Sequence, residues 1–418
     1  MIRNGKKKAI SCALVAAMSV GLAACGTTSY DFKVSYDGIK TGDVSSKVSV
    51  HDPSILKADG EYYIFGSHMS AAKSSDLLNW EKVADGYSKK NPVYGQIYDV
   101  ADEAFAYSGS KNSLIKTDDK QVHVWAPDVI YNETTGLYYM YYCTTSTWNA
   151  SNLCYGTSTT PEGPYEWQGA LIYSGFNRKT ISGTDVLDYV DEDYAYKNYI
   201  KGAQYNYEDY PNAIDPTVFY DADGRMWMVY GSWSGGIFLL EIDKTTGLVI
   251  HPEADKANNV DPYYGKRLLG GGHISIEGPY IMYDETSGYY YLFVSYGALT
   301  SNGGYQVRVF RSKTVDGEYV DMNGKYPEKS AQHQNFGLKL TGNYKLPSLE
   351  KAYMATGHNS AFVDDDGRMY LVYHTRFNDN GEGHSPRVHQ MLVNEDGWPC
   401  ELPYQTPVSY THLRAHET

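Results

Sequence analysis

The sequence predicts an all-β protein, a five-bladed β-propeller, on three observations. First, residues 212–236 contain an Asp-Pro pair, an apolar run, an Asp-Ala-Asp-Gly turn and a second, aromatic-rich strand, which is typical of a β-hairpin. Second, segments that begin at His51, Trp125, Ile276 and Gly357 repeat this pattern. Third, each interval between repeats can hold about four strands, and repeats of roughly 40 residues or more built from four strands are typical of propellers.

Each hairpin carries a polar residue near the start of its first strand, at what we expect to be one equivalent position. These residues are Asp52, Asp128, Asp215, Glu277 and His358. The innermost strands of a propeller run along its central channel, so equivalent positions on them converge at one end. The sequence therefore predicts an active site at the mouth of the axial channel.

The N-terminus, residues 1–24, has the pattern of a lipoprotein signal peptide: basic residues, then an apolar run too short to span a bilayer as a helix. The run ends in Leu-Ala-Ala-Cys-Gly, which resembles the bacterial lipoprotein box, in which Cys25 is the acylated residue. We expect export and a lipid anchor that attaches the protein to the membrane of the bacterial cell envelope. Ordinary cleavage, which would give a secreted protein, is the alternative.

The rest of the chain divides into three segments. Residues 25–47 are polar and aperiodic, as in a tether, and residues 48–407 are expected to form one propeller domain, because blades pack on their neighbours. Residues 408–418 resemble the translation of a sequencing adapter, so we expect a domain truncated near its C-terminal end; a natural polar tail is the alternative. The long insert 176–211 is expected beside the substrate groove.

The formal net charge is −14, and it becomes more negative without the basic N-terminus. A strongly acidic protein repels polyanions, so nucleic acid is excluded as a partner and a neutral polymer is favoured. We expect the protein to be a monomer.

Carboxylates from different strands at one channel mouth suit glycoside cleavage, in which one acid protonates the leaving oxygen and another carboxylate activates water. Asp-Pro and Asp-Gly pairs are also common turn formers. We assign Asp221, Asp223 and residues 364–366 to turns. Asp52, Asp215 and Glu277 occupy the repeated position and are the catalytic candidates.

Several motifs, taken in order, resemble the successive blade motifs of glycoside hydrolase family 43, over nearly all of the mature chain. They are His51-Asp52-Pro53-Ser54, Trp125-Ala126-Pro127-Asp128, Asn212-Ala213-Ile214-Asp215-Pro216, Gly231-Ser232-Trp233-Ser234-Gly235, Ile276-Glu277-Gly278-Pro279-Tyr280 and Gly357-His358-Asn359-Ser360. The residues of these motifs are most similar to those of the endo-acting α-1,5-L-arabinanases of the family.

The resemblance implies an inverting enzyme that cleaves α-1,5-L-arabinofuranosidic bonds in arabinan or arabino-oligosaccharides. Asp52 would be the general base, Glu277 the general acid, and Asp215 the residue that raises the pKa of the acid and orients it. Inversion requires the base and the acid to stand about 6.5 to 9.5 Å apart, so that water fits between them.

The resemblance also implies a substrate-binding set. We expect Trp125 and Trp233 to stack on furanose rings, and other members to form hydrogen bonds around the cleaved bond. The hydrogen-bonding members are Thr145, Asn212, Ser232 and Ser234. Asp128 resembles a residue with a structural role and is left out of the catalytic set.

Related arabinanases hold a calcium ion on the axis through a histidine, which implies Ca²⁺ at His358 here. His374 is the competing candidate. Calcium prefers oxygen ligands, so the site would depend on water and on neighbouring carboxylates.

Two alternatives remain open. The first is an exo-acting α-L-arabinofuranosidase or β-xylosidase of the same family, which would differ in the loops that close one end of the groove. The second is a non-catalytic glycan-binding lipoprotein, and the presence of all three carboxylates argues against it.

Overall fold

The computed structural model describes residues 46–117, 122–147, 149–327, 333–346, 351–377 and 383–405. Strands form most of the regular structure in these ranges, which confirms the all-β prediction. The predicted signal peptide with Cys25, nearly all of the predicted tether and the segment 408–418 lie outside the described residues. Within the described ranges, no helix combines the length and the apolar composition needed to cross a membrane.

The first two sheets are four-stranded and antiparallel, with their strands in chain order. They consist of β1 (Ser54–Ala58), β2 (Glu61–Gly66), β3 (Ser70–Ser74) and β4 (Glu81–Ala84), and of β5 (Val124–Asn132), β6 (Leu137–Thr147), β7 (Ala150–Ser158) and β8 (Glu166–Tyr173). The turn between β1 and β2 is Asp59-Gly60, with φ angles of 53° and 80°. Two positive φ angles match the twist of a two-residue hairpin loop, and Asp-Gly adopts them readily.

The third sheet has six strands. In order they are β11 (Thr217–Tyr220), β12 (Met226–Tyr230), β13 (Ile237–Ile242), β16 (Gly265–Leu269) and β15 (Val260–Asp261), and β14 (Val249–Ile250) pairs with β13. Asp221 lies in the turn between β11 and β12, where its Oδ1 accepts the backbone N–H groups of Asp223 at 3.0 Å and Arg225 at 2.9 Å. This confirms that Asp221 is a turn former.

The largest sheet has eight strands and consists of two antiparallel groups. The first group contains β17 (Ile276–Asp284), β18 (Tyr289–Tyr296), β19 (Gln306–Ser312) and β20 (Leu338–Lys339), and the second β21 (Met354–Val363), β22 (Met369–Arg376), β23 (Ser385–Val393) and β24 (Pro399–Gln405). One parallel pair, Gln306 with Thr356, joins the groups. All five predicted hairpins are therefore present, as the antiparallel pairs β1–β2, β5–β6, β11–β12, β17–β18 and β21–β22.

The helices are short. They are α2 (Gly95–Asp99), α3 (Ala101–Ala104), α4 (Val186–Tyr189) and α5 (Glu192–Asn198), with 3₁₀ turns η1 (Ser67–Met69), η2 (Ile181–Gly183), η3 (Lys256–Asn258) and η4 (His333–Asn335). The insert 176–211 contains η2, α4, α5 and a two-stranded sheet of β9 (Ile200–Lys201) and β10 (Gln204–Tyr205). Its end packs on the loop after β12, because the carbonyl oxygen of Tyr210 accepts the N–H of Gly235 at 2.9 Å.

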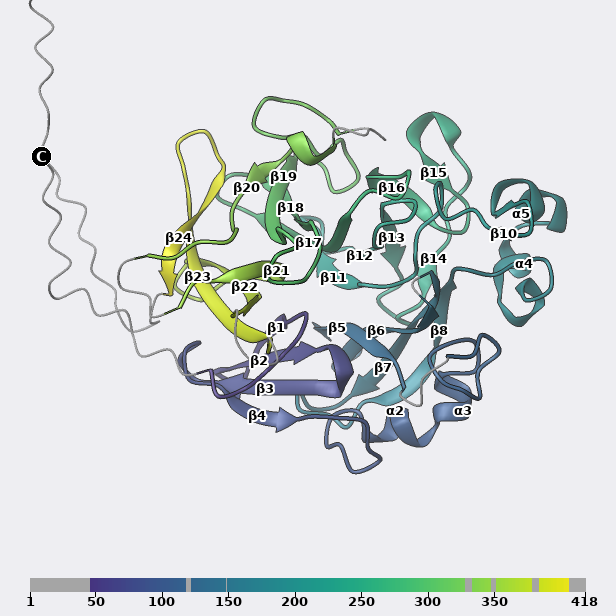
Figure 1. Cartoon of the computed structure of the whole chain (residues 1–418), viewed down its shortest axis with the longest axis horizontal. Helices are drawn as coiled ribbons and strands as arrows, with labels where there is room; N and C mark the ends of the chain where they lie inside the picture. Colours follow the sequence, from purple (N-terminus) through teal and green to yellow (C-terminus); the bar gives the residue numbers. More distant parts are fainter. Residues whose placement is uncertain are drawn as a thin grey trace, which may run out of the picture. The chain divides into compact units, whose positions relative to one another are not determined.

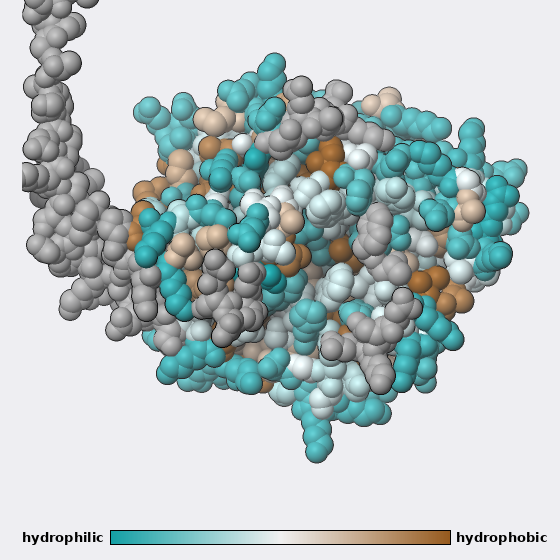
Figure 2. Space-filling view, in the orientation of Figure 1, coloured by the Kyte–Doolittle hydropathy of each residue, from teal (hydrophilic) through white to brown (hydrophobic). Residues whose placement is uncertain are grey.

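The first strands of the five antiparallel groups contact one another in a closed series: β1 with β5, β5 with β11, β11 with β17, β17 with β21, and β21 with β1. Figure 1 shows these strands nearest the centre of the described domain. Among the described residues, five buried hydrophobic clusters fill the spaces between neighbouring groups. One of them packs Val372 and Val388 of the last group against Ile64 and Ala72 of the first, so hydrophobic burial also joins the two ends of the series. The face in Figure 2 is mainly hydrophilic, with small hydrophobic patches.

Candidate active site

One backbone position recurs in all five groups and holds a residue in the left-handed conformation. It is occupied by Asp52, Ala126, Asp215, Gly278 and His358, whose φ angles lie between 41° and 57°. A proline follows in four groups and an asparagine in the fifth. Aspartate and histidine are among the residue types that adopt this conformation more often than others, which suits three of the five.

The prediction of a shared polar position is therefore correct for Asp52, Asp215 and His358 and wrong for Asp128 and Glu277. Asp128 lies two residues after the left-handed residue of its group, inside β5, and Glu277 lies one residue before its own, inside β17. In Glu277's group the left-handed position is glycine because a Cβ atom there would lie 3.1 Å from the His358 ring. The limited space beside the backbone at Gly278 thus explains why the residue with the carboxyl lies one position earlier.

Asp52 is buried and surrounded by hydrogen-bond donors and histidines. Its Oδ2 accepts the Ser67 hydroxyl at 2.5 Å, and its Oδ1 lies 3.0 Å from His358 Nδ1 and 3.1 Å from His51 Nε2. Burial raises the pKa of Asp52, but the nearby His358 and His51 outweigh burial and hold that pKa well below its usual range. Asp52 is therefore ionised at neutral pH.

Glu277 has different neighbours. Its Oε1 accepts the Tyr305 hydroxyl at 2.8 Å, and its Oε2 accepts Trp233 Nε1–H at 2.7 Å and the Ser232 hydroxyl at 3.3 Å. Burial of the carboxyl raises the pKa of Glu277; Tyr305, His358 and Trp233 oppose this rise, and the charge of Asp52 adds to it. The net effect raises the pKa of Glu277, so this carboxyl stays protonated to a higher pH than the carboxyl of an exposed glutamate.

Asp215 interacts electrostatically with both of these carboxyls. Its Oδ2 accepts the backbone N–H of Gly278 at 3.2 Å, next to Glu277. Burial raises the pKa of Asp215 to about 7, with His358 opposing and Glu277 and Asp52 adding to the rise. Asp215 and Glu277 therefore titrate as an interacting pair, in which the charge of one favours the protonated form of the other.

Asp128 has a structural environment, as expected. It is buried, accepts the Ser54 hydroxyl, and accepts the backbone N–H of Val218 at 2.6 Å. Since Ser54 is in β1, Asp128 in β5 and Val218 in β11, this carboxyl joins three of the five groups.

The predicted substrate-binding residues lie around the carboxyls. Ser232 and Trp233 bond Glu277 directly, while Ser234 is buried and its hydroxyl has no hydrogen-bond partner among the described residues. Trp125 is half-buried, and the indole N–H of this residue also lacks a partner in the described part of the chain. Both unpaired atoms are buried.

Thr145 and Asn212 are the two remaining members of the predicted set, and one chain of hydroxyls connects them. Thr145 Oγ1 lies 2.8 Å from Ser151 Oγ, and Ser151 donates to Asn212 Oδ1 at 2.8 Å. Asn212 also precedes Asp215 by one short turn. The structure thus connects Thr145 to Asn212, which lies three residues before Asp215 in the chain.

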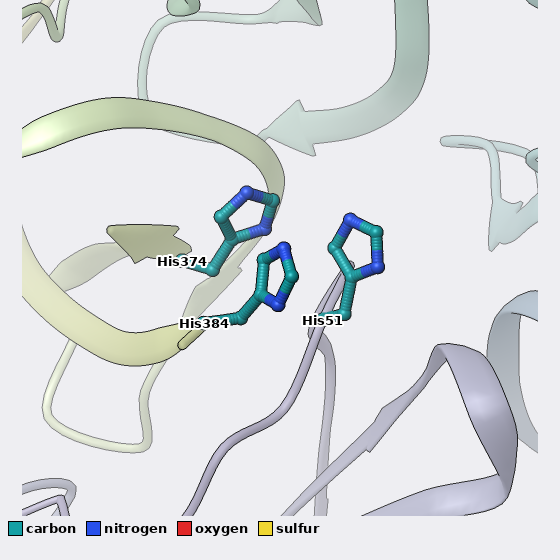
Figure 3. A group of neighbouring side chains, drawn as sticks. All are labelled: His51, His374 and His384. Carbon is teal, nitrogen blue, oxygen red and sulfur yellow. The ribbon is translucent and has the colours of Figure 1, made fainter. Parts of the chain in front are cut away.

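Three histidines form a second cluster (Figure 3), and one of them, His51, lies with its Nε2 3.1 Å from Asp52 Oδ1. His51, His374 and His384 each offer a ligand atom, and these atoms lie within 4.8 Å of one another. His51 Nδ1 and His374 Nε2 are buried without a hydrogen-bond partner among the residues that the structure describes, and Arg376 Nε donates to His384 Nε2 at 3.1 Å. Burial is the largest cause that lowers the pKa of each histidine, so all three rings are neutral.

The expected calcium ligand, His358, is paired with Asp52, with His358 Nδ1 3.0 Å from Asp52 Oδ1. Burial lowers its pKa, but the charge and hydrogen bond of Asp52 raise that pKa to about 9, which makes the ring an imidazolium at neutral pH. An imidazolium has no free lone pair for a metal. The competing candidate, His374, is held neutral by burial and lies beside His51 and His384; a hard cation there would take its oxygen ligands from water and Asp52.

The sequence profile described as Glycosyl hydrolases family 43 matches residues 44–210 and 191–399. The chain belongs to glycosyl hydrolase family 43. It is 37% identical over 388 residues to extracellular endo-α-(1→5)-L-arabinanase 2 of Bacillus subtilis (strain 168), an alignment that covers 87% of this chain and 72% of that protein. It is 27% identical over 369 residues to extracellular exo-α-(1→5)-L-arabinofuranosidase ArbA of Cellvibrio japonicus (strain Ueda107), covering 85% of this chain and 87% of ArbA.

Among solved structures, the crystal structure of endo-1,5-α-L-arabinanase from Thermotoga petrophila RKU-1 is similar, with a TM-score of 0.71 and 38% identity. The match covers 87% of this chain and 76% of that one. As a family 43 hydrolase, this protein is an enzyme that cleaves glycosidic bonds, and the pair of carboxyls with opposite pKa shifts suits that chemistry.

Sequence reasoning missed two contacts of this family 43 site. Ser67 follows β2 in a Gly-Ser pair, as Ser232 follows β12, and each hydroxyl donates to a catalytic candidate. This repeated Gly-Ser pair was a usable signal. Tyr305 lies in the loop before β19, where no repeated pattern marks it, and only the folded chain brings it to Glu277.

Proposed function

We propose that the protein hydrolyses α-1,5-L-arabinofuranosidic bonds in arabinan and arabino-oligosaccharides, by endo cleavage and with inversion at the anomeric carbon. The observation that carries this proposal is the contrast between Asp52, which is held ionised, and Glu277, which is held toward its protonated form. Inverting glycosidases need one carboxyl in each state. The endo-arabinanases that share 37% and 38% identity with the chain support arabinan as the substrate.

In the proposed reaction, Glu277 donates its proton to the glycosidic oxygen while Asp52 accepts a proton from the attacking water. Ser67 and His358 hold the two oxygens of Asp52, which fixes the direction in which the base meets water. Glu277 raises the pKa of Asp215, and because the interaction of the two carboxyls is mutual, the charge of Asp215 is proposed to disfavour ionisation of Glu277. The buried site strengthens each of these electrostatic effects, because less water screens them.

We place this chemistry in a five-bladed propeller domain, residues 48–407, with the site at the mouth of its axial channel. The closed series of contacts among the first strands, and the five hydrophobic clusters between groups, support this architecture.

The stacking role proposed for Trp233 needs one addition. Its indole N–H donates to Glu277, so the edge of the ring is occupied and its face is the part that can meet a sugar. Trp125 is half-buried and its indole nitrogen is buried, so its exposed part is also proposed to meet a sugar through the ring face. Ser234, Thr145 and Asn212 add hydroxyl and amide groups suited to the hydroxyls of a furanose.

For the calcium ion, we propose binding at the histidine cluster of His51, His374 and His384 instead of at His358. A cation there would supply positive charge near Asp52 and so favour the ionised base. We further propose that the protein is an exported monomer with a lipid anchor at Cys25. The word extracellular in the names of the relatives supports export.

The product profile on linear arabinan tests the proposed function. Endo cleavage gives a mixture of oligosaccharides early in the reaction, whereas exo cleavage gives one short product from the start. Proton NMR of the first product tests inversion, since the new reducing end must carry the opposite anomeric configuration. Release of xylose from xylo-oligosaccharides, with no product from arabinan, would favour the β-xylosidase alternative, and binding without hydrolysis of either polymer would favour the non-catalytic one.

A further inference from the structure

The two oxygens of Glu277 have different hydrogen-bond donors. Oε2 accepts the indole N–H of Trp233 at 2.7 Å and, at the longer distance of 3.3 Å, the hydroxyl of Ser232, whereas Oε1 accepts the hydroxyl of Tyr305 at 2.8 Å. An indole N–H can only donate, whereas a phenol hydroxyl can donate or accept. The hydroxyl oxygen of a protonated carboxyl is a weaker acceptor than the carbonyl oxygen, so the short bond from the obligate donor Trp233 favours Oε2 as the carbonyl oxygen and Oε1 as the oxygen that carries the proton.

From this asymmetry we propose that Trp233 and Tyr305 are positioning residues that place the transferable proton of Glu277 on Oε1, and that the Tyr305 hydroxyl stabilises the carboxylate left after transfer. The proposal rests on the role of Glu277 as general acid in the proposed function. It adds one residue outside the predicted set, Tyr305, and gives Trp233 a role besides sugar stacking.

Both donors are held rigidly. Tyr305 is buried, its ring stacks on His374 with centroids 5.9 Å apart, and it fills the space where a Cβ atom on Gly357 would lie 2.3 Å from a ring carbon. The backbone N–H of Trp233 donates to the carbonyl of Ile276 at 2.7 Å, directly before Glu277. Groups fixed in this way need no reorganisation when the proton moves.

The step balances as follows. The proton on Glu277 Oε1 passes to the glycosidic oxygen as its bond to the anomeric carbon breaks, water forms the new bond to that carbon, and Asp52 takes the proton of the water. Glu277 is left as a carboxylate and Asp52 as an acid, and proton exchange with solvent restores both. The Tyr305 hydrogen bond becomes charge-assisted during this step, and such bonds are roughly twice as strong as neutral ones.

The groups that interact with the Glu277 carboxyl are Asp52, Asp215, His358, Tyr305 and Trp233. Replacing Tyr305 by phenylalanine keeps the ring and its stacking on His374, leaves the other four groups in place, and removes one donor that favours ionised Glu277. A shift in the alkaline limb of the pH profile therefore reports on this hydrogen bond.

The experiment compares the full chain with its Tyr305→Phe and Trp233→Phe variants on linear arabinan over a range of pH. We expect kcat to fall about tenfold in each, because a donor to developing negative charge is lost, and the alkaline limb of kcat/KM to move up by about one pH unit. An aryl arabinoside with a good leaving group should lose much less rate, since it needs less help from the acid. Tyr291→Phe is the matched control: it removes a hydroxyl that bonds Gly397, away from Glu277, so the pH profile should not move.

Glu277→Gln separates this proposal from the proposed function. If Glu277→Gln keeps substantial activity, the role of Glu277 itself is wrong and this inference falls with it. If Glu277→Gln is inactive but Tyr305→Phe keeps the wild-type alkaline limb, or moves it down, this inference alone is wrong. Thermal melting checks folding, and Tyr305→Phe, which loses a single oxygen atom, decides the matter if Trp233→Phe is unstable.

Discussion

At the residue scale, the chemistry of the site depends on which partners each carboxyl has. Asp52 meets imidazoles and a serine hydroxyl at contact distance, while Glu277 accepts hydrogen bonds from neutral donors and is influenced by the charges of His358, Asp52 and Asp215. Two side chains with similar intrinsic acidity are thus set to opposite protonation states by position alone. The left-handed conformation of Asp52 and Asp215, which costs of order 1–3 kcal/mol for a residue other than glycine, is part of how the fold aims them.

The separate roles of acid and base predict different rescue by the substrate. An aryl arabinoside with a good leaving group should restore activity to Glu277→Ala by at least tenfold relative to arabinan, because protonation of the leaving group then matters less. Asp52→Ala should show no such gain, since water must still be activated. Initial rates on both substrates check this, and equal rescue of the two variants would contradict the assignment.

The ion pair of Asp52 and His358 predicts a pH-dependent contribution to stability. The pKa of His358 is raised to about 9, so its contribution is fully present below its unfolded pKa of about 6.5 and is lost as the pH rises through 9. Asp52→Asn should therefore lower the free energy of unfolding by about 1–3 kcal/mol near pH 6 and by much less near pH 10. Urea unfolding at the two pH values measures the difference. An equal loss of free energy of unfolding at both would show that the ion pair makes no pH-dependent contribution to stability.

At the element scale, Asp128 shows how one carboxyl organises strands instead of catalysis. It joins β1, β5 and β11 through Ser54 and Val218. Asp128→Ala should lower the free energy of unfolding by about 2–4 kcal/mol, because a hydroxyl and a backbone N–H would be left buried without an acceptor. The kcat of the remaining folded enzyme on arabinan should stay within about threefold of wild type. A large fall in kcat with unchanged stability would instead make Asp128 part of the catalytic machinery.

At the scale of the whole molecule, the histidine cluster joins the two ends of the series of groups. His51 precedes β1, His374 lies in β22 and His384 precedes β23, so a bound cation would link the first group to the last. A ligand that binds only the folded state stabilises it by mass action. A chelator should therefore lower the melting temperature by a few degrees and reduce activity together, and added Ca²⁺ should restore both.

The matched variants for that prediction are His374→Ala, which should abolish the response to the chelator, and His358→Ala, which should keep it. Melting curves with and without chelator measure the response independently of activity. If His358→Ala abolishes the response and His374→Ala does not, the cation lies at the position that the sequence first indicated.

The sequence by itself determined the class of fold, the five hairpins and the three catalytic candidates. Strand periodicity, Asp-Gly turns and repeated motifs are local features, and they are written in consecutive residues. The residue that precedes proline also marks the left-handed position in four of the five groups. In two of these four groups, however, the polar residue lies at a different position.

Only the tertiary structure decided the partners of those candidates. Tyr305, Ser67 and the cluster of His51, His374 and His384 reach the site from loops and strands far apart in the chain, and no local pattern specifies such distances. The protonation states follow from the same cause, because burial and neighbouring charge shift a pKa only once folding has brought the groups together. For this protein the sequence identifies the candidate carboxyls, and the packing of the five groups sets the direction in which each pKa is shifted and the residues that hold each carboxyl.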